Sequence, residues 1–119
     1  MINDTFVYKT AADCQVKLDL FRPDVRQRRV PVVVWIHGGA LISGVRTALD
    51  SRPGLRDFLL ENGVAVAAID YRLAPETKLP GILEDLRDAF AWIVNEASAY
   101  GLDPSRIATI GHSAGDTWR

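Results

Sequence analysis

The sequence is poor in features that would mark several classes of protein. Its 119 residues include 14 basic and 15 acidic side chains, giving a net charge of −1, so no basic excess points to nucleic acid and no acidic run points to a disordered tail. No apolar stretch approaches the roughly 18 residues of a membrane-spanning helix. The N-terminus also lacks the basic segment and apolar run of a signal peptide. We therefore expect a soluble, cytoplasmic protein with no membrane span and no nucleic-acid partner.

Cysteine and histidine are scarce as well. Cys14 is the only cysteine, which excludes an intrachain disulfide and a cysteine-rich metal site. Because it lies in a segment of alternating apolar and polar residues, we expect a buried, inert thiol. The residues predict neither a metal nor a cofactor. The only two histidines, His37 and His112, each adjoin a glycine motif.

Two hydrophobic patterns predict strands. Residues 14–23 alternate and, together with residues 5–9, predict a pair of half-buried strands. One face of the alternating segment carries Cys14, Val16, Leu18 and Leu20. Residues 32–36, 64–70 and 106–111 are continuous apolar runs, which are typical of strands buried on both faces.

Helical patterns separate these runs. Leu55, Phe58 and Leu59 predict a helix over residues 53–62 that stops at Gly63. A longer amphipathic helix is predicted from about Ile82 to Tyr100 and ends at Gly101. Its apolar stripe comprises Ile82, Leu86, Ala89, Ile93 and Ala97, and its polar side comprises Glu84, Asp85, Arg87, Asp88 and Glu96.

The alternation of buried strands with helices predicts an α/β fold. We expect a three-layer sandwich with a mostly parallel sheet, in which the last strand lies beside the strand ending at Ile36. In such sheets, ligands bind beyond the carboxyl ends of the strands. The segments that follow the three buried strands are therefore the candidate site.

Residues 111–115 read Gly-His-Ser-Ala-Gly, a G-x-S-x-G pattern. After a buried strand, this pattern places a nucleophilic serine, Ser113, on a tight strand-to-helix turn. Gly111 and Gly115 leave room in that turn. The N–H of Ala114 would be one donor to an oxyanion.

Residues 37–40 read His-Gly-Gly-Ala and follow an earlier buried strand. A glycine-rich turn at this point could supply the second oxyanion donor. A plain turn and a phosphate-binding loop are the alternatives. The phosphate patterns G-x-x-x-x-G-K-[ST] and G-x-G-x-x-G are both absent.

Residues 71–76 read Tyr-Arg-Leu-Ala-Pro-Glu and lie between these two motifs. The three motifs in this order resemble the hormone-sensitive-lipase-like carboxylesterases and the neighbouring acetyl-xylan and feruloyl esterases, which have the α/β-hydrolase fold. The similarity runs from Leu18 to Gly115. It implies a serine hydrolase that cleaves small-molecule carboxylic esters through an acyl-serine intermediate.

The resemblance also implies a role for each matching residue. Ser113 would be the nucleophile, and Ala40, which keeps its N–H, stands where many members have a third glycine. His37 would brace the glycine loop. The implied oxyanion donors are Gly38, Gly39, Ala40 and Ala114. The implied scaffold residues are Tyr71, Arg72 and Glu76.

No residue is placed to act as the base. His37 opens the glycine loop, and the side chain of His112 should point away from that of its neighbour Ser113. For Asp70, at a strand end, we expect a structural or capping role. In the resembled family the acid and the base follow the serine, yet only six residues follow Ser113 here. We therefore expect residues 1–119 to be the N-terminal part of a single α/β-hydrolase domain, through truncation, a frameshift or an incomplete gene.

Two alternatives stay open at this point. The chain is a non-catalytic binding module, or it is a half that becomes active when a complementing chain supplies the acid and base. Because the helix and strands expected after the serine are missing, the strand ending at Gly111 would be left as an apolar edge, which favours self-association.

Overall fold

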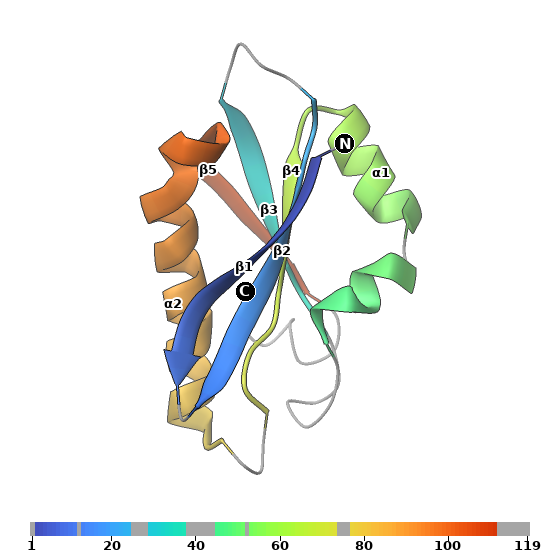
Figure 1. Ribbon diagram of the computed structural model, residues 1–119. Helices are drawn as coiled ribbons and strands as arrows, with labels where there is room; N and C mark the ends of the chain where they lie inside the picture. Colours follow the sequence, from blue (N-terminus) through green and yellow to red (C-terminus); the bar gives the residue numbers. More distant parts are fainter. Residues whose placement is uncertain are drawn as a thin grey trace.

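Within the described residues, five strands form one sheet in the order β1-β2-β4-β3-β5 (Figure 1). The computed structural model describes residues 2–11, 13–24, 29–37, 45–51, 53–73 and 77–111. The strands are β1 (Ile2–Ala11), β2 (Cys14–Arg22), β3 (Val30–Ile36), β4 (Ala65–Ile69) and β5 (Leu102–Gly111). The helices are α1 (Pro53–Glu61) and α2 (Leu79–Glu96), with two 3-10 helices, η1 (Arg46–Ser51) and η2 (Ala97–Tyr100).

The sheet combines a parallel and an antiparallel part. β3 pairs in parallel with both β4 and β5, so the last strand lies beside the strand ending at Ile36, as predicted. β1 and β2 form the predicted N-terminal pair, and β2 joins the sheet by running antiparallel to β4. The parallel sheet predicted from the buried runs is therefore confirmed for β4, β3 and β5, and the N-terminal pair makes the whole sheet mixed.

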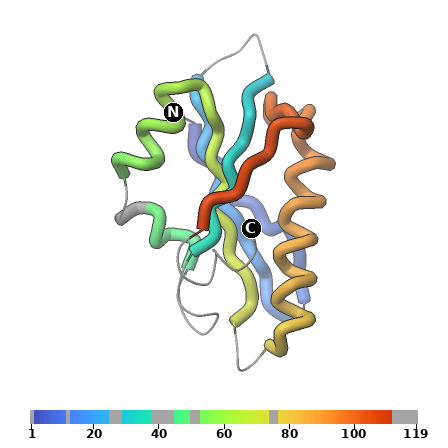
Figure 2. Tube along the Cα trace, turned by 180° about the vertical axis from the view of Figure 1, so that it is seen from behind, coloured from blue at the N-terminus to red at the C-terminus, as the bar shows by residue number. Residues whose placement is uncertain are grey.

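Helices cover both faces of the sheet, which confirms the three-layer α/β arrangement. α2 packs on one face, while η1 and α1 lie on the opposite face (Figures 1 and 2). The apolar stripe predicted for the long helix is buried throughout, at Ile82, Leu86, Ala89, Ile93 and Ala97. The smaller core under η1 and α1 consists of Phe21, Trp35, Leu49, Val66 and Ala68.

Two glycines end the helices where the sequence predicted. Gly63 follows α1 with φ of 74°, and Gly101 follows η2 with φ of 71°. Both values lie in the left-handed region, which glycine adopts without steric cost. The N–H of Gly63 donates to the carbonyl of Leu60, and that of Gly101 donates to the carbonyl of Ala97. The carbonyls of the last helical turns are thus satisfied.

Two burial predictions, for Cys14 and for the last strand, were wrong, and both concern an edge of the structure. Cys14 is exposed, because it begins β2 opposite Ala11, next to the turn of the β1–β2 hairpin. At the end of a hairpin, an alternating pattern of apolar and polar residues does not ensure that the apolar side chains are buried. Phe58 is 62% exposed, and α1 turns Leu55 and Leu59 toward the sheet instead. β5 is only partly buried, because it lies at the edge of the described sheet.

Candidate active site

The carboxyl ends of β3, β4 and β5 meet at one edge of the sheet. Ile36 at the end of β3 is the Cα partner of both Ile69 in β4 and Gly111 in β5. His37 follows β3 directly, and the segment 70–72 follows β4 directly. This is the edge at which the sequence predicted a site.

Two of the predicted site residues, His37 and Gly111, are described by the structure. The other predicted site residues lie outside the described residues; they are Gly38, Gly39, Ala40, His112, Ser113, Ala114 and Gly115. The predicted scaffold residue Glu76 also lies outside them. What the structure brings together at this edge is the set of contacts around His37, Asp70, Tyr71 and Arg72.

Tyr71 holds His37 in two ways. Its hydroxyl donates a 3.0 Å hydrogen bond to the backbone oxygen of His37. The two rings stack with 4.3 Å between centroids and 6° between planes. Burial raises the pKa of Tyr71 to about 12, so the hydroxyl remains protonated, and therefore a donor, at neutral pH. His37 itself is 1% exposed, so its ring lies in the protein interior against Tyr71.

Asp70 holds the chain at Arg46. The backbone N–H of Arg46 donates to Oδ1 of Asp70 at 2.6 Å, and the guanidinium donates to Oδ2 at 2.7 Å. The same guanidinium donates to Asp19 at 3.0 Å, and Asp19 also accepts from the hydroxyl of Thr5. The Asp70 carboxylate therefore joins the end of β4 to the first residue of η1.

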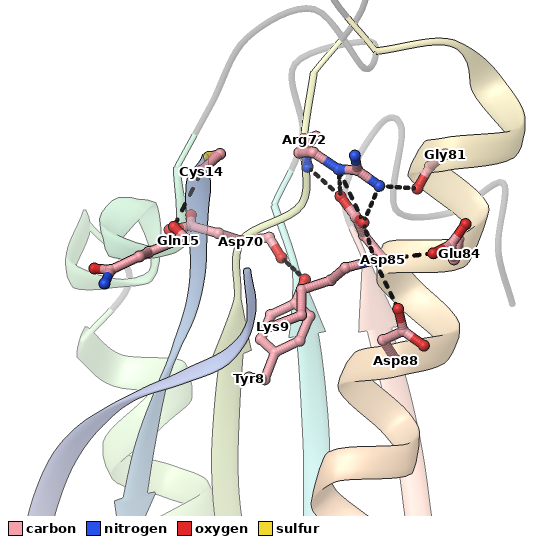
Figure 3. A network of polar contacts seen from close by, with 10 residues as sticks. All are labelled: Tyr8, Lys9, Cys14, Gln15, Asp70, Arg72, Gly81, Glu84, Asp85 and Asp88. Atoms are coloured by element: carbon pink, nitrogen blue, oxygen red, sulfur yellow. Dashed lines mark hydrogen bonds and ion pairs between the residues drawn. The ribbon is translucent and has the colours of Figure 1, made fainter. Parts of the chain in front are cut away.

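Arg72 is fixed by Asp85, a buried carboxylate on α2 (Figure 3). Oδ2 of Asp85 accepts from the backbone N–H of Arg72 at 2.8 Å and from Nε at 2.8 Å, while Oδ1 accepts from Nη2 at 2.7 Å. Nζ of Lys9 lies 2.9 Å from Oδ1 of Asp85 and 2.6 Å from Asp88. Burial alone would raise the pKa of Asp85, but the hydrogen bonds from Arg72 and Lys9 outweigh it and hold that pKa below its usual value. Asp85 is therefore ionised at neutral pH.

The full burial of Asp85 corrects the prediction that it lies on the polar side of the helix. A signal was available in the sequence, because Asp85 stands three residues after Ile82 and four before Ala89, on the buried stripe. Gly81 completes the arrangement, since its carbonyl accepts from Arg72 at 3.3 Å. A Cβ at Gly81 would come within 2.8 Å of Thr77.

Two kinds of feature were sought in the part of the chain that the structure describes: a cluster of metal ligands and a membrane-spanning helix. The described residues include no group of three or more His, Cys, Asp or Glu side chains able to hold a metal ion. No helix formed by these residues has the length and apolar character needed to cross a membrane.

Comparison with known proteins identifies the family. The family model BD-FAE matches residues 18–117, a range that includes both glycine motifs. The chain belongs to the BD-FAE family. The resemblance to hormone-sensitive-lipase-like esterases is thereby confirmed, and with it the α/β-hydrolase fold.

Several proteins that are similar to this chain are esterases. The carboxylesterase NlhH of Mycobacterium tuberculosis is 38% identical over 112 residues, which cover 93% of this chain and 34% of that protein. The solved thermophilic esterase Est2 of Thermogutta terrifontis superimposes with a TM-score of 0.84 and 28% identity, over 94% of this chain and 40% of that one. The non-reducing polyketide synthase atr1 of Stereocaulon alpinum is 36% identical over an alignment that covers 94% of this chain and 5% of the synthase.

The chain thus spans about a third of the carboxylesterase and a far smaller share of the synthase. Esterases among the relatives support a hydrolase function at the level of the family.

Proposed function

We propose that residues 1–119 form the nucleophile and oxyanion half of a serine carboxylic-ester hydrolase that acts on small-molecule esters. Oγ of Ser113 attacks the ester carbonyl carbon, the alcohol leaves, and water then hydrolyses the acyl-serine. The N–H groups that stabilise the negative oxygen in both steps are those of Gly38, Gly39, Ala40 and Ala114.

The observation that carries this proposal is the pairing of Ile36 with Gly111 across β3 and β5. Gly38 is two residues beyond the first partner, and Ser113 is two residues beyond the second. Adjacent strands lie about 4.8 Å apart, and two residues of chain span at most about 7 Å. The register therefore supports one ester carbonyl being within reach of both motifs.

The base is the part of the mechanism that these residues do not supply. The proton of Ser113 must pass to a base and from there to the leaving alcohol. His37, one of the two histidines, is buried in a stack with Tyr71. We propose that the base and the acid come from residues beyond these 119, on the same polypeptide or on a complementing chain.

The test compares two protein contexts. In the first, the 119-residue chain and its Ser113→Ala variant are assayed with p-nitrophenyl acetate at pH 8, and equal rates are expected. In the second, residues 1–115 are continued by the sequence that follows the matching motif in the Mycobacterium tuberculosis carboxylesterase. This chimera should hydrolyse the ester, and Ser113→Ala should lower its kcat by up to roughly 10⁶, as loss of the serine does in subtilisin.

His112→Ala is the matched control, since it changes the neighbouring residue without removing the nucleophile, and its effect should be far smaller. A 119-residue chain that exceeds Ser113→Ala by about a hundredfold would contain its own base, and His37 or His112 would become the candidate. If the chimera remains active when it carries Ser113→Ala, the assignment of Ser113 as the nucleophile is contradicted. Inactivity of the folded chimera would favour a non-catalytic module.

We also propose that the chain associates with itself through β5. This strand lies at the edge of the described sheet and carries two half-buried isoleucines, Ile107 and Ile110. A long edge strand with apolar side chains pairs readily with another chain. Size-exclusion chromatography should show oligomers that Ile107→Lys shifts toward monomer, and a monodisperse wild-type monomer would contradict the proposal.

A further inference from the structure

The two residues that follow β4 contact the two ends of one chain segment. That segment lies between His37 and Arg46 and carries the proposed oxyanion donors. We infer that Asp70 and Tyr71 are positioning residues that fix both of its ends. The inference rests on the proposed function for its catalytic consequence, whereas the contacts themselves are independent of it.

Each contact is made to a backbone atom at the segment's end. The hydroxyl of Tyr71 donates to the backbone oxygen of His37 at 3.0 Å. The carboxylate of Asp70 accepts from the backbone N–H of Arg46 at 2.6 Å. Two consecutive residues at the end of β4 therefore contact the chain at His37, where it leaves β3, and at Arg46, where it enters η1.

A second interaction reinforces each of these bonds. The ring of Tyr71 stacks on the ring of His37. The Asp70 carboxylate also pairs with the guanidinium of Arg46 at 2.7 Å. Hydrogen bonds to charged groups are stronger than those between neutral groups, and the two interactions together restrict both the position and the rotation of each end.

Asp70 and Arg72, the two residues that flank Tyr71, form hydrogen bonds to three different elements. The N–H of Asp70 donates to the carbonyl of Lys17 in β2 at 2.9 Å, and its carbonyl accepts from the hydroxyl of Tyr8 in β1. The N–H of Arg72 donates to Asp85 on α2. Tyr71 therefore lies between two residues whose backbones are fixed, and Figure 3 shows Asp70, Arg72 and Asp85 in this arrangement.

Fixed ends matter because oxyanion donors act through their position. Donors aimed in advance at the developing negative oxygen stabilise the transition state more than the bound ester. A misplacement of about 1 Å can cost on the order of a hundredfold in rate. Loosening either end should therefore lower kcat and leave KM nearly unchanged.

The contacts can be tested without catalysis, by hydrogen–deuterium exchange and mass spectrometry of the 119-residue chain. The variants are Tyr71→Phe, which removes one hydroxyl, and Asp70→Ala. Peptides covering residues 37–48 should exchange about tenfold faster, the order expected for losing one hydrogen bond, while peptides from β4 stay unchanged. Asp19→Ala is the matched control, because Asp19 accepts from the guanidinium of Arg46, whereas Asp70 also accepts from its backbone N–H.

The outcomes separate a positioning role from a general structural one. Faster exchange confined to residues 37–48 in both variants supports the inference. Exchange that rises equally in all peptides, or that stays unchanged at residues 37–48, overturns it. Should Tyr71→Phe fail to fold, Asp70→Ala alone decides between these outcomes at the Arg46 end.

The chimera described above supplies the catalytic readout. Tyr71→Phe and Asp70→Ala should each lower kcat about tenfold or more, with KM within about twofold of the parent, and Asp19→Ala should leave both constants unchanged. An unchanged kcat in both variants overturns the catalytic consequence. If Ser113→Ala leaves the chimera active, the proposed function fails. The exchange experiment still tests whether Asp70 and Tyr71 fix the two ends of the segment.

Discussion

The face of the sheet under α2 buries five residues of that helix, whereas α1 on the opposite face buries none completely. The α2 face also holds the ionic contacts of Asp85 with Arg72 and Lys9. On the α1 face, Leu49 of η1 is fully covered. We infer that the α2 layer supplies most of the fold's stability and that α1 is the more weakly attached layer.

The largest effect is expected from the centre of the α2 face. Ile93 is 1% exposed, so Ile93→Ala should lower the free energy of unfolding by about 3–4 kcal/mol through lost burial and the cavity left behind. Urea denaturation followed by circular dichroism measures this. The neighbouring Val94, 48% exposed, is the control, and Val94→Ala should change the same quantity by less than about 0.5 kcal/mol. Equal losses in the two variants would contradict the packing described here.

The next largest effect is expected for Asp85→Ala. This variant should lower the free energy of unfolding by about 3 kcal/mol, because it leaves Arg72 and Lys9 without a buried partner. Both cations keep some contact with water, at 17% and 12% side-chain exposure, which places the effect at the lower end of the range for buried pairs.

The effect of Asp85 should also depend on pH. Its pKa is lowered in the folded state, so its contribution is present above the unfolded pKa of about 3.9 and is lost as the pH falls through the folded value. The difference in the free energy of unfolding between wild type and Asp85→Ala, measured by urea denaturation, should therefore be large at pH 7 and should shrink below pH 4. A difference that is as large at pH 3 as at pH 7 would contradict the ion pairs.

The smallest effect is expected on the α1 face. Leu59 is half-buried against the smaller core, so Leu59→Ala should cost about 1 kcal/mol. Phe58, one residue earlier and 62% exposed, is the control, and Phe58→Ala should be close to neutral. A loss at Leu59 as large as that at Ile93 would show that the two faces contribute equally.

The fold was predictable where its signal is local. The unbroken apolar runs of β3 and β4 predict strands that are buried on both faces. The helical spacing of the apolar residues from Ile82 to Ala97 predicts which side of α2 is buried. The charge of Asp85 predicts an exposed position, whereas its place on the apolar stripe predicts the burial that the structure has. Its partner Arg72 lies 13 residues away in an irregular segment, where no period reveals a pair.

The candidate site was predictable as a set of motifs but not as a set of contacts. The order of the three motifs identified the family, and the parallel strands predicted a shared edge. The bond from Tyr71 to His37 and the bond from Arg46 to Asp70 join loops across the sheet edge. Their formation depends on the register of strands distant in sequence, which no single segment encodes.

The central place of β3, between β4 and β5, has a consequence for how the protein is made. Of the five described strands, β5 leaves the ribosome after the other four, and it pairs with β3 only across an intervening stretch that contains α1, β4 and α2. Pairing between strands so distant in sequence is slow, because the entropy of closing the loop is lost before the contacts form. During synthesis, β3 therefore lacks this partner until α1, β4 and α2 have been made, and the pairing of Ile36 with Gly111 at the candidate site forms late.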